Sequence, residues 1–131
     1  MRPVPVVAYE LMIGVRLEGI LRATGCPVRV LVAPDPAAVA AAMAGERPEV
    51  AVLDLTAPAA VRQAMMRHAR STGAVVIAFG PHSDAALMAA ARAEGAAEVL
   101  PRSALGHGLA PMVAKHLARV RPSDIPDGPP A

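Results

Sequence analysis

The chain has 131 residues, of which 54% are hydrophobic and 18% are charged, and its formal net charge is +2. A chain of this length and composition can bury one core, so we expect one globular domain that needs neither disulfides nor a structural metal. The one cysteine, Cys26, cannot form an intramolecular disulfide, and scattered arginines with only two aromatic residues argue against nucleic-acid binding.

No apolar stretch reaches the length of a membrane span, and the N-terminus lacks the long apolar region and cleavage pattern of a signal peptide. We therefore expect a soluble, cytoplasmic protein that does not bind membranes. The proline-rich segment at residues 121–131 has the composition of a disordered tail, which leaves residues 1–120 as the folded domain.

Five short apolar runs predict β-strands, at residues 4–9, 27–33, 50–54, 74–79 and 96–100. Each is followed by a segment with helical periodicity. The first helix has an inner face of Ile13, Leu17, Ile20 and Leu21, and it contains Gly14 and Gly19, which packing or a close backbone approach must compensate.

The remaining helices are bounded by capping residues. The second covers residues 36–44, begins at Asp35-Pro36 and ends at Gly45. The third covers residues 59–71, and the fourth runs from Ser83 or Asp84 to Glu94. The last covers residues 109–120, and its first turn contains Pro111. Its inner face is predicted to consist of Leu109, Met112, Val113, Leu117 and Val120.

This alternation predicts an α/β fold, a doubly wound five-stranded parallel sheet of order 2-1-3-4-5 with helices on both faces, as in flavodoxin. In that order the first and third strands are neighbours, and a crevice opens where their carboxyl ends meet. Asp54 ends the third strand, so we expect its carboxylate in the crevice, although an acid there could also only cap the loop.

The sequence resembles a receiver domain of the two-component response regulators, over about residues 4–118. Residues 47–58 contain Pro48, an apolar strand, Asp54 and Pro58, and residues 91–102 match the end of the fourth helix, the fifth strand and the basic residue after it. The resemblance implies that Asp54 is the phosphoacceptor candidate, and that Arg102, Thr56 and Gly80 are the phosphate-contact candidates.

The resemblance fails at the other site positions. Receivers hold Mg²⁺ with an acidic pair after the first strand, whereas here that pair aligns with Ala8 and Tyr9, and Glu10 follows. Glu10 and Asp54 are therefore weak Mg²⁺ candidates, and no cofactor is required otherwise. The family's hydroxyl residue aligns with Gly80 and its lysine with Arg102, which keeps the charge but changes the geometry.

We therefore predict a stand-alone pseudo-receiver, a signalling protein that is not an enzyme, acts through protein–protein contacts and is phosphorylated weakly or not at all. The resemblance implies a histidine kinase or an effector as partner. It also implies dimers or partner contacts through the fourth helix, fifth strand and fifth helix, which we call the Leu87–Lys115 surface and which comprises Leu87, Met88, Arg92, His107 and Lys115.

Two alternatives remain. One is a working aspartyl-phosphate receiver that uses Asp54, Glu10 and Arg102. The other is a small-ligand-binding flavodoxin-like domain, against which the first turn lacks the glycines that a bound nucleotide phosphate needs. The histidines show no ligand spacing, and His82 in the crevice loop is either a plain loop residue or a contact to a bound anion.

Overall fold

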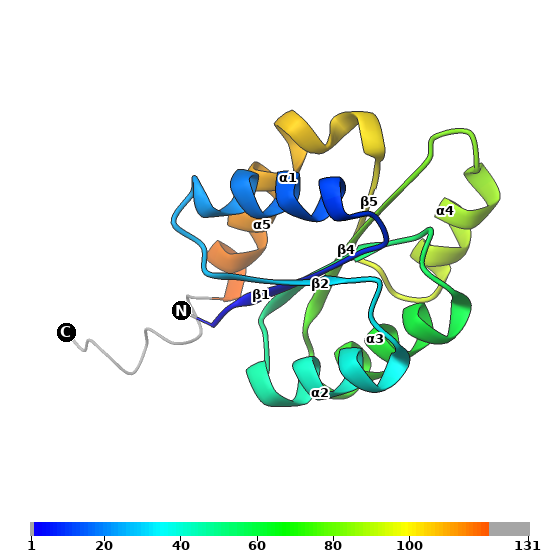
Figure 1. Ribbon diagram of the computed structural model, residues 1–131, viewed down its shortest axis with the longest axis horizontal. Helices are drawn as coiled ribbons and strands as arrows, with labels where there is room; N and C mark the ends of the chain where they lie inside the picture. The colour runs from blue at the N-terminus through cyan, green and yellow to red at the C-terminus, as the bar shows by residue number, and fades with distance from the viewer. Residues whose placement is uncertain (1, 121–131) are drawn as a thin grey trace.

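The computed structural model describes residues 2–120, with side chains described up to residue 117. Within this part five strands alternate with five α-helices (Figure 1). The strands are β1 (Val4–Ala8), β2 (Val28–Val32), β3 (Val50–Asp54), β4 (Val75–Gly80) and β5 (Glu98–Pro101). The helices are α1 (Leu11–Arg22), α2 (Pro36–Glu46), α3 (Ala59–Thr72), α4 (Ala85–Ala93) and α5 (Leu105–Val120), which a 3₁₀ turn, η1 (Arg102–Ala104), precedes. The tail predicted at residues 121–131 lies outside the described residues.

The five strands form one parallel sheet in the order β2-β1-β3-β4-β5. This confirms the doubly wound α/β fold that the alternation of strands and helices predicts. The strand order places β1 beside β3, with Val7 opposite Leu53, so the loops that follow these two strands leave the same edge of the sheet. Asp54 lies opposite Phe79, and Gly80 lies opposite Pro101, so the ends of β4 and β5 complete that edge.

Helices cover both faces of the sheet: α1 and α5 lie on one, and α2, α3 and α4 on the other (Figure 1). Strand β3 contributes alternate residues to the two cores that result. Val50 and Val52 pack with α1 and α5, whereas Ala51 and Leu53 pack with α2, α3 and α4. A strand buried on both faces needs a continuous apolar run, and for this reason the sequence predicts β3 clearly.

Gly14 lies where α1 approaches the sheet. A Cβ atom at this position would be 3.0 Å from Cγ1 of Val30 and 3.4 Å from Cγ2 of Val32, both on β2. The close approach of helix and strand therefore compensates the low helix propensity of this glycine. A Cβ atom at Gly19, by contrast, would have no atom within 4 Å. Contact with the sheet therefore does not explain why a glycine stands at this position.

Two helix ends differ from the predicted ones. Helix α2 continues past Gly45 to Glu46, and Arg47 takes the left-handed cap conformation, with φ of 45°. Helix α5 begins at Leu105 and not at residue 109, so Pro111 lies inside the helix and not in its first turn. Leu105 is fully buried in the core, which favours the earlier start, and Pro111 lies on the exposed side, where water can satisfy the carbonyl left without its donor. Among residues 2–120, no helix is long and apolar enough to span a membrane.

Candidate functional site

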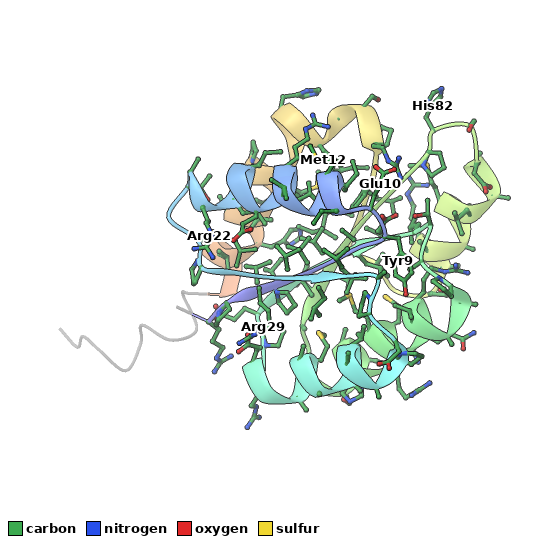
Figure 2. The ribbon with its side chains drawn as sticks, viewed as in Figure 1. Tyr9, Glu10, Met12, Arg22, Arg29 and His82 are labelled. Carbon is green, nitrogen blue, oxygen red and sulfur yellow. The ribbon has the colours of Figure 1, made fainter. Side chains whose placement is uncertain are left out.

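The carboxyl edge of the sheet brings together the residues predicted for the crevice. Asp54 ends β3, Gly80 ends β4, and Arg102 directly follows β5. Glu10 is the N-cap residue of α1 and comes two residues after β1, close to Tyr9 (Figure 2). The predicted site residues therefore share one edge, because parallel strands end on the same side.

Asp54 is completely buried, and both of its carboxylate oxygens accept hydrogen bonds. The backbone N–H of Tyr9 donates to Oδ2 over 3.0 Å. The backbone N–H of Thr56 donates to Oδ1 over 2.9 Å, and the Thr56 hydroxyl donates to the same oxygen over 2.7 Å. Three donors satisfy most of the acceptor sites of the carboxylate, so its oxygens can be buried without an arginine or lysine partner.

These bonds make the Asp54 carboxylate a link between two strands. Tyr9 immediately follows β1, and Thr56 belongs to the turn after β3. The backbone N–H of Leu55 donates to the carbonyl of Phe79 over 2.8 Å, which holds the start of that turn against β4. A carboxylate that attacks a phosphoryl group needs an oxygen open to the donor molecule. In this arrangement neither oxygen of Asp54 is open.

Glu10, the other Mg²⁺ candidate, is exposed. Its side chain caps no N–H of α1 and forms no hydrogen bond or ion pair with the described residues. No group of three or more His, Cys, Asp or Glu side chains suited to a metal ion occurs in the described part of the chain. Mg²⁺ prefers octahedral oxygen ligation through freely accessible carboxylates. A buried carboxylate whose two oxygens already accept hydrogen bonds, beside one exposed glutamate, does not fit it.

Gly80 is buried at the end of β4, directly against Leu55. A Cβ atom at residue 80 would lie 3.3 Å from Cβ of Leu55 and 3.5 Å from its Cδ1. A residue with a side chain would therefore push Leu55, which is buried in the core on the α3 and α4 side of the sheet, by a few tenths of an ångström. The glycine that stands where the resemblance predicts a hydroxyl residue is accordingly closely packed.

We expect Gly80→Ala to lower the free energy of unfolding by about 1 kcal/mol, because the added methyl group overpacks Leu55. Denaturant titration measures this change. Gly19→Ala is the matched control: an added Cβ meets nothing there, so helix propensity should raise stability by about 0.5–1 kcal/mol. If Gly80→Ala were as stable as the parent, Leu55 would be free to move and the packing argument would be wrong.

Thr56 and Arg102, the two predicted phosphate contacts with polar side chains, differ in whether a donor is free. Thr56 is exposed, but its hydroxyl is already used by Asp54. Arg102 is half-buried, and its Nε is a buried donor with no hydrogen-bond partner among the described residues. A buried N–H without an acceptor costs stability. Arg102 is therefore the one predicted site residue that keeps an unused donor at this edge.

The Tyr9 hydroxyl donates to the carbonyl of Pro34, in the connection between β2 and α2. Partial burial raises the pKa of the Tyr9 phenol above its ordinary value of 10.0, and the carboxylates of Asp35 and Asp54 raise it further. His82 is exposed at the outer end of the loop after β4, apart from Tyr9 (Figure 2). This position fits a plain loop residue.

Comparison with solved structures places this geometry among known folds. A response regulator receiver domain protein from Clostridium thermocellum superposes with a TM-score of 0.79 at 18% identity, covering 92% of this chain and 98% of the other. A CheY-like receiver domain protein from Methanospirillum hungatei gives 0.79 at 14% identity, with 94% and 98% covered. The receiver domain of NtrX from Brucella abortus gives 0.76 at 18% identity, with 88% and 98% covered.

The chain has a receiver fold. No protein-family model matches the sequence, and no curated protein does. The likeness therefore lies in the arrangement of strands and helices. The chemistry of the residues at the carboxyl edge follows from their own contacts.

On this receiver fold, the Leu87–Lys115 surface is less apolar than predicted. Met88 is only 8% exposed and packs in the core, and Leu87 is half-buried against that core. The prediction that Met88 lies on the surface is therefore wrong, because α4 turns its apolar residues toward the sheet. Arg92, His107 and Lys115 are exposed.

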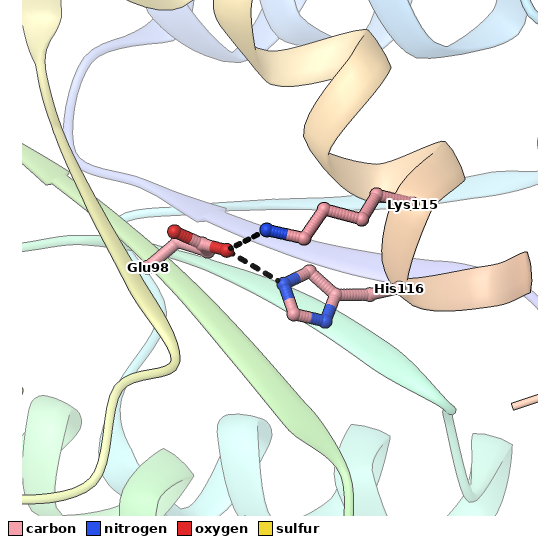
Figure 3. Close-up of polar contacts among 3 residues, drawn as sticks. All are labelled: Glu98, Lys115 and His116. Atoms are coloured by element: carbon pink, nitrogen blue, oxygen red, sulfur yellow. Dashed lines mark hydrogen bonds and ion pairs between the residues drawn. The ribbon is translucent and has the colours of Figure 1, made fainter. Parts of the chain in front are cut away.

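A polar cluster on α5 and β5, in which only His116 is buried, is not among the residues that the sequence predicts to interact. Nε2 of His116 lies 3.0 Å from Oε2 of Glu98, and Nζ of Lys115 lies 2.9 Å from the same oxygen (Figure 3). His116 is only 3% exposed. Hydrogen bonds from Lys115 and His116 lower the pKa of the Glu98 carboxyl below its ordinary value of 4.5. His116 follows Leu109 and Val113 at helical spacing, and that spacing could have indicated its burial.

Proposed function

We propose that this protein is a pseudo-receiver, a signalling protein that acts by binding other proteins and is phosphorylated weakly or not at all. The observation that carries the proposal is the burial and hydrogen bonding of the Asp54 carboxylate. Its carboxylate is completely buried, and its two oxygens accept three hydrogen bonds from Tyr9 and Thr56. Phosphorylation would have to expose this buried carboxylate to the donor molecule and to proceed without a fitting metal site.

The neighbouring residues support the same proposal. In a switching receiver, a hydroxyl after β4 has to contact the phosphoryl group, and here Gly80 packs against Leu55 in its place. Glu10 is exposed and unengaged. A receiver fold that no longer transmits a phosphoryl signal still presents its helical faces, and we infer that a histidine kinase or an effector recognises one of them. Self-association through the Leu87–Lys115 surface stays a prediction.

Incubation with acetyl phosphate and Mg²⁺, followed by intact mass measurement, tests the proposal. We expect no species heavier by one phosphoryl group, while a receiver domain with a complete acidic pair is modified in the same reaction. Beryllofluoride with Mg²⁺ should likewise cause no shift in the amide NMR spectrum. A phosphoryl group that appears on the parent protein and not on Asp54→Asn would overturn the proposal.

One observation favours a second candidate, the working phosphoacceptor. The unused Nε of Arg102 is a buried cationic donor at the edge where Asp54 lies, and arginine binds phosphate well. In this candidate Arg102 would neutralise charge on the phosphoryl oxygens after Asp54 gave up its bonds to Thr56. The same mass measurement on Arg102→Ala distinguishes the two candidates. If the parent is phosphorylated and Arg102→Ala is not, the second candidate is established.

A further inference from the structure

A basic groove runs between α3 and the turn that joins α4 to β5, away from the Asp54 edge. Its main hollow has a volume of about 310 Å³ and is lined by Gln63, Met66, Arg67, Arg70 and Glu94. A smaller hollow of about 90 Å³ continues it, bounded also by Ala69, Ala74 and Gly95. We call this surface the α3–α4 groove.

The floor of the α3–α4 groove is apolar. Met66 is 7% exposed and belongs to the core, and the end of its side chain, Cε, reaches to 3.7 Å from the position of a Cβ atom on Gly95. Ala69 continues the floor and is also buried. Because methionine is flexible and polarizable, such a floor can adapt to the shape of an inserted apolar side chain.

The wall on the α3 side is cationic. Helix α3 contains Arg62, Arg67 and Arg70 and no acidic residue. Arg70 donates to the backbone carbonyl of Glu94 over 3.3 Å, and in the described part of the chain neither Arg67 nor Arg70 forms an ion pair.

Three other cations of the described residues form ion pairs, whereas Arg2, Arg16, Arg47, Arg62, Arg92 and Arg102 form none. Arg22 pairs with Glu18, Arg29 with Glu46, and Lys115 with Glu98. The groove arginines therefore differ from these in having no carboxylate of their own, although Glu94 lines the same hollow. Unpaired arginines along an apolar hollow match a ligand that brings both carboxylates and an apolar group.

We propose that the α3–α4 groove binds an acidic peptide segment of a partner protein, with one apolar side chain on Met66 and carboxylates on Arg67 and Arg70. The inference rests on the proposed function, because it names the surface and the chemistry of the partner that a pseudo-receiver would need. Arginine binds carboxylates in a bidentate geometry, which selects for acidic residues beside the apolar anchor. A nucleic acid is disfavoured, since the floor offers no aromatic ring on which a base could stack.

Fluorescence anisotropy with the full chain tests the inference. The probes are short labelled peptides rich in Asp and Glu with one central Leu, and matched peptides with Lys in place of the acids. We expect binding of the acidic peptides only, weakened at least about tenfold by the double change Arg67→Glu/Arg70→Glu and weakened by added salt. Arg2→Glu/Arg16→Glu changes the charge equally at two exposed positions outside the groove and should leave the affinity within about twofold of the parent.

Amide NMR shifts provide the second measurement, and we expect them in α3 and in the α4–β5 turn. The inference is overturned if the acidic peptides do not bind, if both double variants weaken binding equally, or if a DNA duplex binds through the same arginines as tightly. A further probe is a peptide of residues 121–131, which contains Asp124, Ile125 and Asp127. If this peptide alone binds, the occupant is the chain's own segment 121–131, and the assignment to a separate partner is wrong.

Failure of the groove inference can be distinguished from failure of the proposed function. Phosphorylation of Asp54 would overturn the pseudo-receiver proposal but would leave peptide binding at the groove unchanged. Absence of both phosphorylation and peptide binding would overturn the groove assignment alone. The two experiments use the same full chain and share no variant.

Discussion

Replacing Asp54 by Ala should lower the free energy of unfolding by about 2–4 kcal/mol. The change removes the acceptor for the backbone N–H groups of Tyr9 and Thr56 and for the Thr56 hydroxyl. Hydrogen bonds to a charged group contribute about 1.5–3 kcal/mol each, and buried donors left without a partner cost about 1–3 kcal/mol. Because Thr56 is exposed, water can replace part of its loss, so the Tyr9 N–H should account for most of the effect.

Asp54→Asn refines this test, because it keeps the size of the side chain. Its amide oxygen can still accept from Thr56, but its NH₂ group would face the N–H of Tyr9, so we expect a smaller loss of about 1–2 kcal/mol. Asp84→Ala is the control: this exposed aspartate caps α4 by accepting from the N–H of Leu87, and its loss should cost about 1 kcal/mol. Denaturant titration measures all three.

The sign of the Asp54→Ala effect distinguishes two roles of the residue. A catalytic carboxylate that is buried for its chemistry often lowers the free energy of unfolding. A carboxylate that joins β1 to β3 instead raises it. An Asp54→Ala protein more stable than the parent would therefore contradict the structural role and favour the working phosphoacceptor.

The second large effect is expected at His116. We expect His116→Ala to cost about 2–3 kcal/mol, because it leaves a cavity where a buried ring lay and removes one partner of Glu98. Lys115→Ala removes the other partner from a side chain that is 56% exposed and should cost less than about 1 kcal/mol. Equal losses in the two variants would contradict the view that the burial of His116 matters more than its contact with Glu98.

Glu98 makes part of this stability depend on pH. Its pKa in the folded protein is lowered, so the unfolded chain binds the proton more readily than the folded one. The contribution of Glu98 is therefore present above pH 4.5 and is lost as the pH falls through the lowered pKa of the folded state. Glu98→Gln should remove this loss, giving a flatter stability profile below pH 4.5 in denaturant titrations at several pH values.

The receiver fold could be predicted from local signals. The apolar runs of β1 and β3 are long and uninterrupted, and Gly73 and Gly95 have the positive φ that helix ends favour. The helix ends that were wrong depend on less local effects. Arg47, a residue with no special preference for the left-handed conformation, ends α2, and the burial of Leu105 extends α5 past the expected start.

The candidate site could be predicted in position but not in contacts. Asp54, Gly80 and Arg102 lie at the expected edge, because all strands of a parallel sheet end on the same side. The bond from the Tyr9 N–H to Asp54 joins residues 45 positions apart, and no local pattern indicates which way a carboxylate turns. The same holds for Glu98, which meets Lys115 and His116 across 17 and 18 positions.

The hydrogen bond from Tyr9 to Asp54 also has a kinetic meaning. A backbone N–H that is bound to a buried carboxylate exchanges with deuterium only when that contact opens. The Tyr9 amide therefore reports, in the unmodified protein, how often the Asp54 oxygen becomes free. Under conditions where each opening leads to exchange, the exchange rate equals the opening rate, and the opening rate is the upper limit for any ligand or phosphoryl donor that needs this oxygen to be free.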